Sequence, residues 1–107
     1  MLAVVVVWPL FFTPPCQALQ PEEVLVVANR EIPESLELAE FYMQRRKVPQ
    51  ANLLRVSTTD GETCTRQAYL HQIAAPVRQK LLAYPLARRP RCLLLMKGIP
   101  LRVAAVP

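Results

Sequence analysis

Glycine is scarce in this 107-residue chain, and its scarcity excludes one large class of ligand site. The only glycines are Gly61 and Gly98, which lie 37 residues apart. A phosphate-binding loop needs several glycines within a few residues, so no such loop is present. The single histidine, His71, and the three cysteines lack the spacing of a zinc site. The sequence therefore contains no recognisable catalytic motif, no metal site and no cofactor site.

Acidic residues are absent from the chain after Glu62. Residues 63–107 carry eight basic and no acidic side chains, whereas residues 19–62 carry five basic and eight acidic ones. Such an asymmetry can mark a nucleic-acid or membrane-surface patch. Here no aromatic side chains interleave with the basic ones, as stacking on bases requires. We therefore expect no nucleic-acid partner.

The amino-terminal segment has the features of a removable targeting signal. Met1–Phe12 carries no charged side chain and is shorter than the roughly 20 apolar residues of a membrane-spanning helix. Pro14 and Pro15 then break any helix, and small residues precede a cleavage position after Ala18. This pattern predicts a signal peptide over residues 1–18 and an exported mature protein, periplasmic or extracellular, without a stable membrane span. A retained, buried strand is the alternative interpretation, because the segment is rich in β-branched residues.

Two cysteines remain after the predicted cleavage. They can pair in an oxidising compartment. The sequence pattern places Cys64 in an exposed loop and Cys92 in a buried strand, so we expect two free thiols rather than a disulfide.

Three apolar runs predict strands. Val24–Ala28 is a continuous β-branched run, which is typical of a strand covered on both faces. Asn52–Ser57 is less apolar, which indicates a position nearer an edge. Cys92–Met96 is the most apolar stretch after residue 18, which favours a central position in the sheet.

Two stretches with helical periodicity separate these strands. Pro33 is a favoured first helical residue, and Leu36, Ala39 and Met43 follow at spacings that share one face. In the second stretch Thr65 is a plausible N-cap. An apolar face then recurs every four residues, at Tyr69, Ile73, Val77 and Leu81. Pro76 lies within this face and predicts a kink, or two shorter helices that meet near Ala75.

The order of these elements predicts an α/β fold with a β-α-β-α-β pattern. Crossovers of this length imply a parallel sheet with right-handed connections, in the spatial order 2-1-3, within a partial three-layer sandwich over residues 19–107. The third strand then exposes an edge. We expect the chain to be a truncated amino-terminal part whose missing carboxyl-terminal part is a possible partner. The competing interpretation is that Met1–Phe12 is retained and packs against the bare sheet.

The carboxyl ends of parallel strands share one rim, which is where ligands bind in open α/β sheets. Polar residues follow each predicted strand at this rim, and together they can hold a polar or anionic group. These candidate ligand-binding residues are Asn29, Arg30, Ser57, Thr58, Asp60, Lys97 and Gly98. The alternative is that they belong to ordinary solvated loops.

Three stretches resemble the start of an uncharacterised family of exported bacterial proteins. They read PEEVLVVANREIPESLELAEFYMQRRKVPQANLLRVST, QIAAPVRQKLL and LLLMKGIPLRV, and the resemblance covers Pro21 to Val103. It implies a signal peptide and a parent of several hundred residues with no assigned activity. Two positions depart from the pattern: Ile32 stands where a capping residue is expected, and Ala68 stands where an acidic residue is expected.

A more distant similarity in layout is to gingipain and caspase-like cysteine peptidases. Those proteins also have a very apolar third strand followed by a loop with Ile-Pro, here Leu93–Pro100. Their catalytic residues lie beyond later strands, so the similarity transfers no catalytic residue to this chain. The hypotheses are therefore a non-catalytic amino-terminal part of an exported protein, part of a hydrolase whose catalytic residues lie beyond residue 107, or a binding module that uses the strand-end rim.

Overall fold

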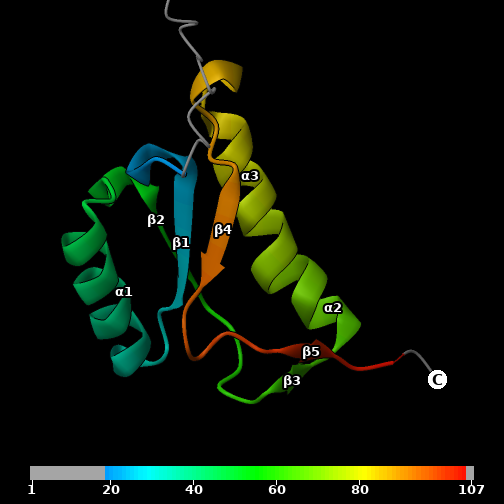
Figure 1. Cartoon of the computed structure of the whole chain (residues 1–107). Helices are drawn as coiled ribbons and strands as arrows, with labels where there is room; N and C mark the ends of the chain where they lie inside the picture. The colour runs from blue at the N-terminus through cyan, green and yellow to red at the C-terminus, as the bar shows by residue number, and fades with distance from the viewer. Residues whose placement is uncertain (1–18, 106–107) are drawn as a thin grey trace, which may run out of the picture.

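The computed structural model describes residues 19–105, so the predicted signal peptide and its alternative lie outside the described part. Within that part, no helix is long and apolar enough to cross a bilayer. The elements run in the following order: η1 (Pro21–Glu23), β1 (Val24–Asn29), α1 (Pro33–Arg46), η2 (Gln50–Asn52), β2 (Leu53–Val56), β3 (Thr63–Cys64), α2 (Arg66–Ala68), η3 (Tyr69–Ala74), α3 (Ala75–Ala83), η4 (Leu86–Arg88), β4 (Cys92–Leu95) and β5 (Arg102–Val103) (Figure 1).

The main sheet has three parallel strands in the order β2-β1-β4. This arrangement confirms the predicted β-α-β-α-β fold and its spatial order. All six residues of β1 are buried, which agrees with the continuous apolar run of its sequence. β1 therefore forms the centre of the molecule, with one neighbouring strand on each side.

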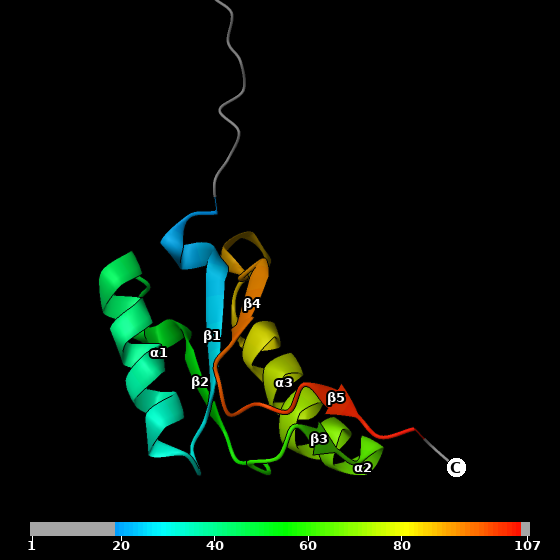
Figure 2. The same cartoon turned by 60° about the horizontal axis from the view of Figure 1, so that its bottom comes forward.

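The helices cover opposite faces of the sheet, which makes three layers (Figure 2). Val24 and Val26 of β1 pack in one cluster with Ala39 and Met43 of α1. Leu25, its neighbour in the strand, packs in a second cluster with Ile73 and Val77 of the other helical segment. Successive side chains of a strand point to opposite faces, so alternate residues of β1 belong to the two clusters. The reversal of direction between the two crossovers places the helices on different sides.

Helix α1 begins as its sequence predicts. Pro33 occupies the first turn, and Ile32 is the N-cap without a side-chain hydrogen bond. At the other end, Lys47 adopts the left-handed conformation with φ 58°, and its N–H donates to the Met43 carbonyl. This C-cap ends the helix before the Val48-Pro49 pair and directs the chain back toward β2.

The second helical segment runs without a break from Arg66 to Ala83, and its hydrogen-bonding pattern changes next to Pro76. The Thr65 hydroxyl accepts a hydrogen bond of 3.0 Å from the Ala68 N–H and caps α2, as expected. A π-helical turn, η3, then leads into α3, which starts at Ala75. Proline has no N–H to donate to the preceding turn, and a wider π turn accommodates the missing hydrogen bond. His71 lies on this turn and is exposed, as predicted.

Three expectations from the sequence are wrong. β4 lies at an edge of the described sheet, as the predicted strand order requires, and not at the central position that its apolar sequence favoured; its residues are only partly covered. Cys92 at its start is accordingly half-buried. Cys64 lies not in an exposed loop but buried in β3, which pairs in parallel with β5. Hydropathy alone placed β4 wrongly, because the position of a strand in a sheet depends on its neighbours. No disulfide joins Cys64 and Cys92, in agreement with the expected free thiols.

Candidate functional site

Asn29, the last residue of β1, connects all three strand ends at the rim. Its side chain is completely buried, and its Nδ2 amide lies within hydrogen-bonding distance of three carbonyl oxygens. These belong to Thr58 at 3.1 Å, Thr59 at 3.2 Å and Gly98 at 2.9 Å. The loop after β2 and the turn after β4 are therefore joined through one amide group.

The other polar atoms of Asn29 also have partners inside the protein. Its Oδ1 accepts from the Glu31 N–H at 3.0 Å and from the Thr58 N–H at 3.5 Å. Its main-chain N–H donates to the buried Ser35 hydroxyl at 3.0 Å. Buried polar groups in proteins are almost always paired in this way. Asn29 thus shapes the rim, and its hydrogen-bonding capacity is used within the fold.

The predicted residues after β2 and beside Asn29 differ in accessibility. Thr58 is buried, and its hydroxyl oxygen has no hydrogen-bond partner among the described residues. Ser57 is exposed, and its hydroxyl donates to Glu31 Oε1 at 2.6 Å. Arg30 is exposed, while its main-chain N–H donates to the Val56 carbonyl at 2.7 Å. Of these three predicted residues, Ser57 and Arg30 are exposed and Thr58 is buried.

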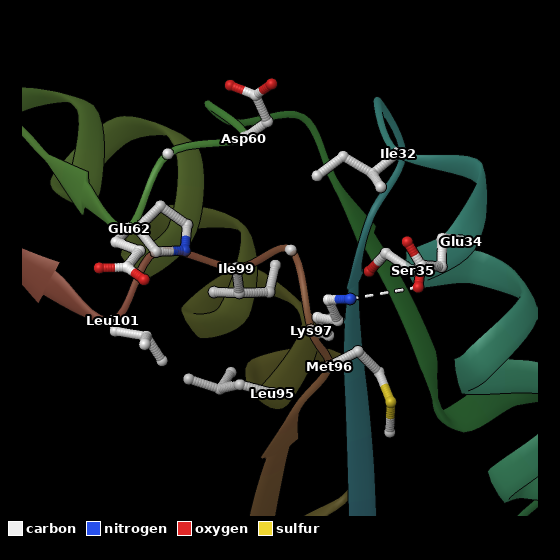
Figure 3. Close-up of a pocket in the computed structure, with 13 residues that line it drawn as sticks. Ile32, Glu34, Ser35, Asp60, Glu62, Leu95, Met96, Lys97, Ile99 and Leu101 are labelled. Atoms are coloured by element: carbon white, nitrogen blue, oxygen red, sulfur yellow. Dashed lines mark hydrogen bonds and ion pairs between the residues drawn. The ribbon is translucent and has the colours of Figure 1, made fainter.

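The remaining three predicted residues line a hollow of about 620 Å³ at the carboxyl edge of the sheet. The first turn of α1 forms one side, and the loop that leads into β3 forms another. The turn between β4 and β5 supplies most of the rest. The lining residues are Ile32, Glu34, Ser35, Asp60, Gly61, Glu62, Leu95, Met96, Lys97, Gly98, Ile99, Pro100 and Leu101. Figure 3 shows Glu62 and Leu101 across the hollow from Glu34 and Ser35.

Gly98 allows the turn after β4 to approach α1 closely. Its φ is +107°, a conformation that other residues rarely adopt. A Cβ atom at this position would lie 3.0 Å from Ile32 Cδ1 and 3.2 Å from Ser35 Cβ. The glycine thus sets the distance between two walls of the hollow and presents its carbonyl oxygen to Asn29.

The charged side chains around the hollow are predominantly acidic. Lys97 pairs with Glu34 at 3.2 Å, and Glu62 pairs with Arg102 at 3.7 Å. More than two thirds of each of these four side chains is exposed, so both ion pairs are weak. Asp60 has no ion-pair partner among the described residues. The mouth therefore carries three carboxylates and one ammonium group among the lining residues.

Sequence reasoning missed the apolar walls of the hollow and two of its carboxylates. Ile99 belongs to the turn after the third predicted strand, and neither Ile99 nor Leu101 was among the predicted site residues. Glu34 and Glu62 were likewise not among the predicted site residues. A proline-containing turn directly after an apolar strand was the available signal for Ile99. The contribution of Glu62 depends on the pairing of β3 with β5, which no local pattern indicates.

Among residues 19–105, the chemically reactive side chains form no catalytic arrangement. Cys64 is buried and His71 is exposed on a different element. In the same range there is no group of three or more His, Cys, Asp and Glu side chains fit to hold a metal ion. What the rim does contain is an apolar hollow with a polar, acidic mouth. Comparison of the chain with models of known families, with curated proteins and with solved structures finds no match.

Proposed function

We propose that this chain is a non-catalytic binding unit of an exported α/β protein, and that the strand-end hollow holds its ligand. The position supports this function, because open parallel sheets bind ligands beyond the carboxyl ends of their strands. The volume of about 620 Å³ lies within the range of small-molecule and short-peptide sites. The proposal that the protein is exported depends on the signal-peptide pattern of residues 1–18. Secreted material that begins at Leu19 would support it, and an intact Met1 would contradict it.

The lining indicates the chemical class of the ligand. Aliphatic walls from Ile32, Ile99 and Leu101 favour an apolar body. Asp60 at the mouth lacks an ion-pair partner among the described residues and favours a cationic group. The ligand class is therefore an apolar peptide or amine with one positive charge, rather than the anionic group that the polar rim residues suggested. The observation that carries this proposal is the unpaired Asp60 carboxylate beside an apolar hollow.

A peptide titration of the full 107-residue chain tests this function. The probe is N-acetyl-Leu-Lys-Leu-amide, compared with the same tripeptide carrying glutamate or norleucine at its centre. We expect the lysine peptide to bind best and to shift the amide resonances of Gly61 and Gly98. Asp60→Asn should weaken its binding by about threefold to tenfold, the effect of losing one partly exposed charge pair.

Glu40→Gln is the matched control, because Glu40 is an exposed carboxylate of α1 that does not line the hollow. This variant should bind the lysine peptide as the unaltered chain does. Equal affinity for all three peptides, or resonance shifts remote from the rim, would contradict the proposed site. Cleavage of the peptide, followed by mass spectrometry, would contradict a non-catalytic role and favour the hydrolase hypothesis.

A further inference from the structure

One side of β4 has no neighbouring strand among residues 19–105. The strand pairs with β1 along its whole length, from Cys92 opposite Val24 to Leu95 opposite Val27. Figure 1 shows β1 on one side of β4, and in the strand order of the described sheet no strand follows on the other side. Such an edge is a template for a further strand unless bulges, prolines or charged residues within it prevent pairing. β4 reads Cys-Leu-Leu-Leu and contains none of these.

The side chains of β4 leave apolar surface on the face that α3 covers elsewhere. Leu93 is 46% exposed and Leu95 is 51% exposed. Their register partners in β1, Leu25 and Val27, pack against the residues of η3 and α3 and are fully buried. On this face of the sheet, the helical segment thus covers the side chains of β1 and leaves those of β4 partly exposed.

A groove follows the same edge on the opposite face, between β4 and α1. It has a volume of about 530 Å³, and apolar side chains of both elements line it. Phe41 is 62% exposed and Leu38 is 43% exposed, although both belong to the helix that covers this face. A strand placed beside β4 would therefore bury alternate side chains on both faces. The lining residues are Leu38, Phe41, Tyr42, Arg45, Arg46, Leu94, Leu95, Met96 and Lys97.

Arginines without an ion-pair partner among the described residues lie beside this apolar strip. Arg45 and Arg46 line the groove, and no carboxylate does. The Arg45 guanidinium lies over the Phe41 ring, 5.7 Å from its centre. Arg91 precedes β4, and Lys97 follows it and pairs with Glu34 of α1. The strip therefore complements a segment that is apolar at alternate positions and carries acidic side chains next to these arginines.

We infer that the free edge of β4 binds an extended, acidic segment of another polypeptide as a fourth strand. Main-chain hydrogen bonds to β4 supply affinity, and the apolar strips on the two faces select alternate side chains. Charge argues against a second copy of this chain, because two such edges would bring the same arginines and lysines together. It also argues against the chain's own Met1–Phe12, which has no acidic side chain.

A synthetic strand tests this inference on the full chain. The probe is a short peptide that alternates valine and threonine and carries two glutamates at each end. Its matched control has N-methyl groups on alternate main-chain nitrogens, which remove strand pairing and leave the side chains unchanged. We expect the unmethylated peptide to protect exposed β4 amides from hydrogen exchange, and N-methylation to weaken binding by about tenfold or more.

Variants of the arginines that line the groove test the charge argument. Arg45→Glu combined with Arg46→Glu should weaken binding by about tenfold, whereas Arg78→Glu, an exposed arginine of α3, should leave it unchanged. Leu95→Lys places a charge in the edge itself and should abolish binding. Arg45 and Arg46 do not line the hollow, so loss of peptide binding in their double variant is distinguishable from loss of the proposed ligand in the hollow.

Three results would overturn the inference. Equal binding of the methylated peptide would exclude strand pairing. Reversible dimers of the chain alone, abolished by Leu95→Lys, would show that a second copy occupies the edge. Protection of β4 in the chain alone, abolished by Val5→Asp, would show that the chain's own amino-terminal run covers it.

Discussion

β1 and β4 are adjacent strands of similar apolar sequence, yet they lie in very different surroundings. In register, Leu25 of β1 faces Leu93 of β4. Leu25 is fully buried, whereas Leu93 is 46% exposed. The two leucines share a face of the sheet, and they differ in what covers them. Burial of a strand residue in this protein therefore depends on the helices and strands beside it rather than on its own hydropathy.

The hydrogen bonds of asparagine side chains also differ between β1 and β4. At the amino ends of the strands, Asn52 Nδ2 donates to the carbonyl oxygens of Glu22 and Val24, both at 3.0 Å. The Tyr84 hydroxyl donates to Asn52 Oδ1 at 2.8 Å. At the carboxyl ends, Asn29 joins the loop after β2 to the turn after β4. Asparagine side chains thus hydrogen-bond to β1, β2 or their loops at both ends of these strands. The described part of β4 has one such contact, through the Gly98 carbonyl in the turn that follows it.

Asn29→Asp should remove the connection between the two halves and have the largest effect. It replaces the amide donor with an oxygen that faces three carbonyl oxygens. We expect a loss of about 4 kcal/mol in the free energy of unfolding, as for other uncompensated buried charges. Urea denaturation measures this loss. Gln44→Glu makes the same chemical change at an exposed position of α1 and should cost less than about 0.5 kcal/mol. Similar losses for the two variants would contradict the role of Asn29.

Truncation of the paired leucines measures the difference between the strands directly. Leu25→Ala should cost about 3 kcal/mol, because it leaves a cavity between β1 and the second helical segment. Leu93→Ala removes the same atoms from a half-exposed site and should cost less than about 1 kcal/mol. Thermal or urea unfolding of both variants provides the comparison. If Leu93→Ala were as costly as Leu25→Ala, then β4 would be covered in solution, and the free edge would not exist.

The smallest effect concerns Tyr84 and depends on pH. Desolvation by burial raises the pKa of Tyr84 above its ordinary value of 10.0. The folded state therefore holds the hydroxyl proton more tightly than the unfolded state does. The contribution of the protonated Tyr84 hydroxyl to the free energy of unfolding is complete below pH 10, and it is lost as pH rises through the raised pKa. Tyr84→Phe should cost about 1 kcal/mol at neutral pH, and its stability should decrease less between pH 9 and 11. An unchanged alkaline decrease in this variant would show that other groups cause it.

The sequence predicts the framework well, because the relevant signals are local. A β-branched run predicts β1, and the Thr65 cap and the periodicity after it predict the second helical segment. Pro76 predicts a disturbance within that segment, which is observed as a change from π-helical to α-helical hydrogen bonding at Ala75. Right-handed crossovers then leave few possible strand orders, and the observed order is the predicted one. The rim residues also follow from this logic, since parallel strands end at one edge.

The details of the candidate site do not follow from local signals. Cys64 was misplaced because β3 is two residues long and forms only by pairing with β5, nearly 40 positions later in the chain. Asn29 was identified as a ligand-binding residue, but its amide is used by carbonyl groups of two distant loops. The acidic mouth of the hollow likewise combines Glu34, Asp60 and Glu62, which the fold brings together from separate elements.

The amino-acid sequence by itself determined which segments of this protein become the three strands of the main sheet and the two helical segments between them, and which way those strands run. These properties depend on hydrophobic period, caps and crossover handedness, which act over short stretches of chain. Only the tertiary structure decided which apolar residues are covered, which polar groups are already satisfied, and where a hollow and a free edge remain. Those properties depend on contacts between segments far apart in the chain, and such contacts exist only once the layers have packed.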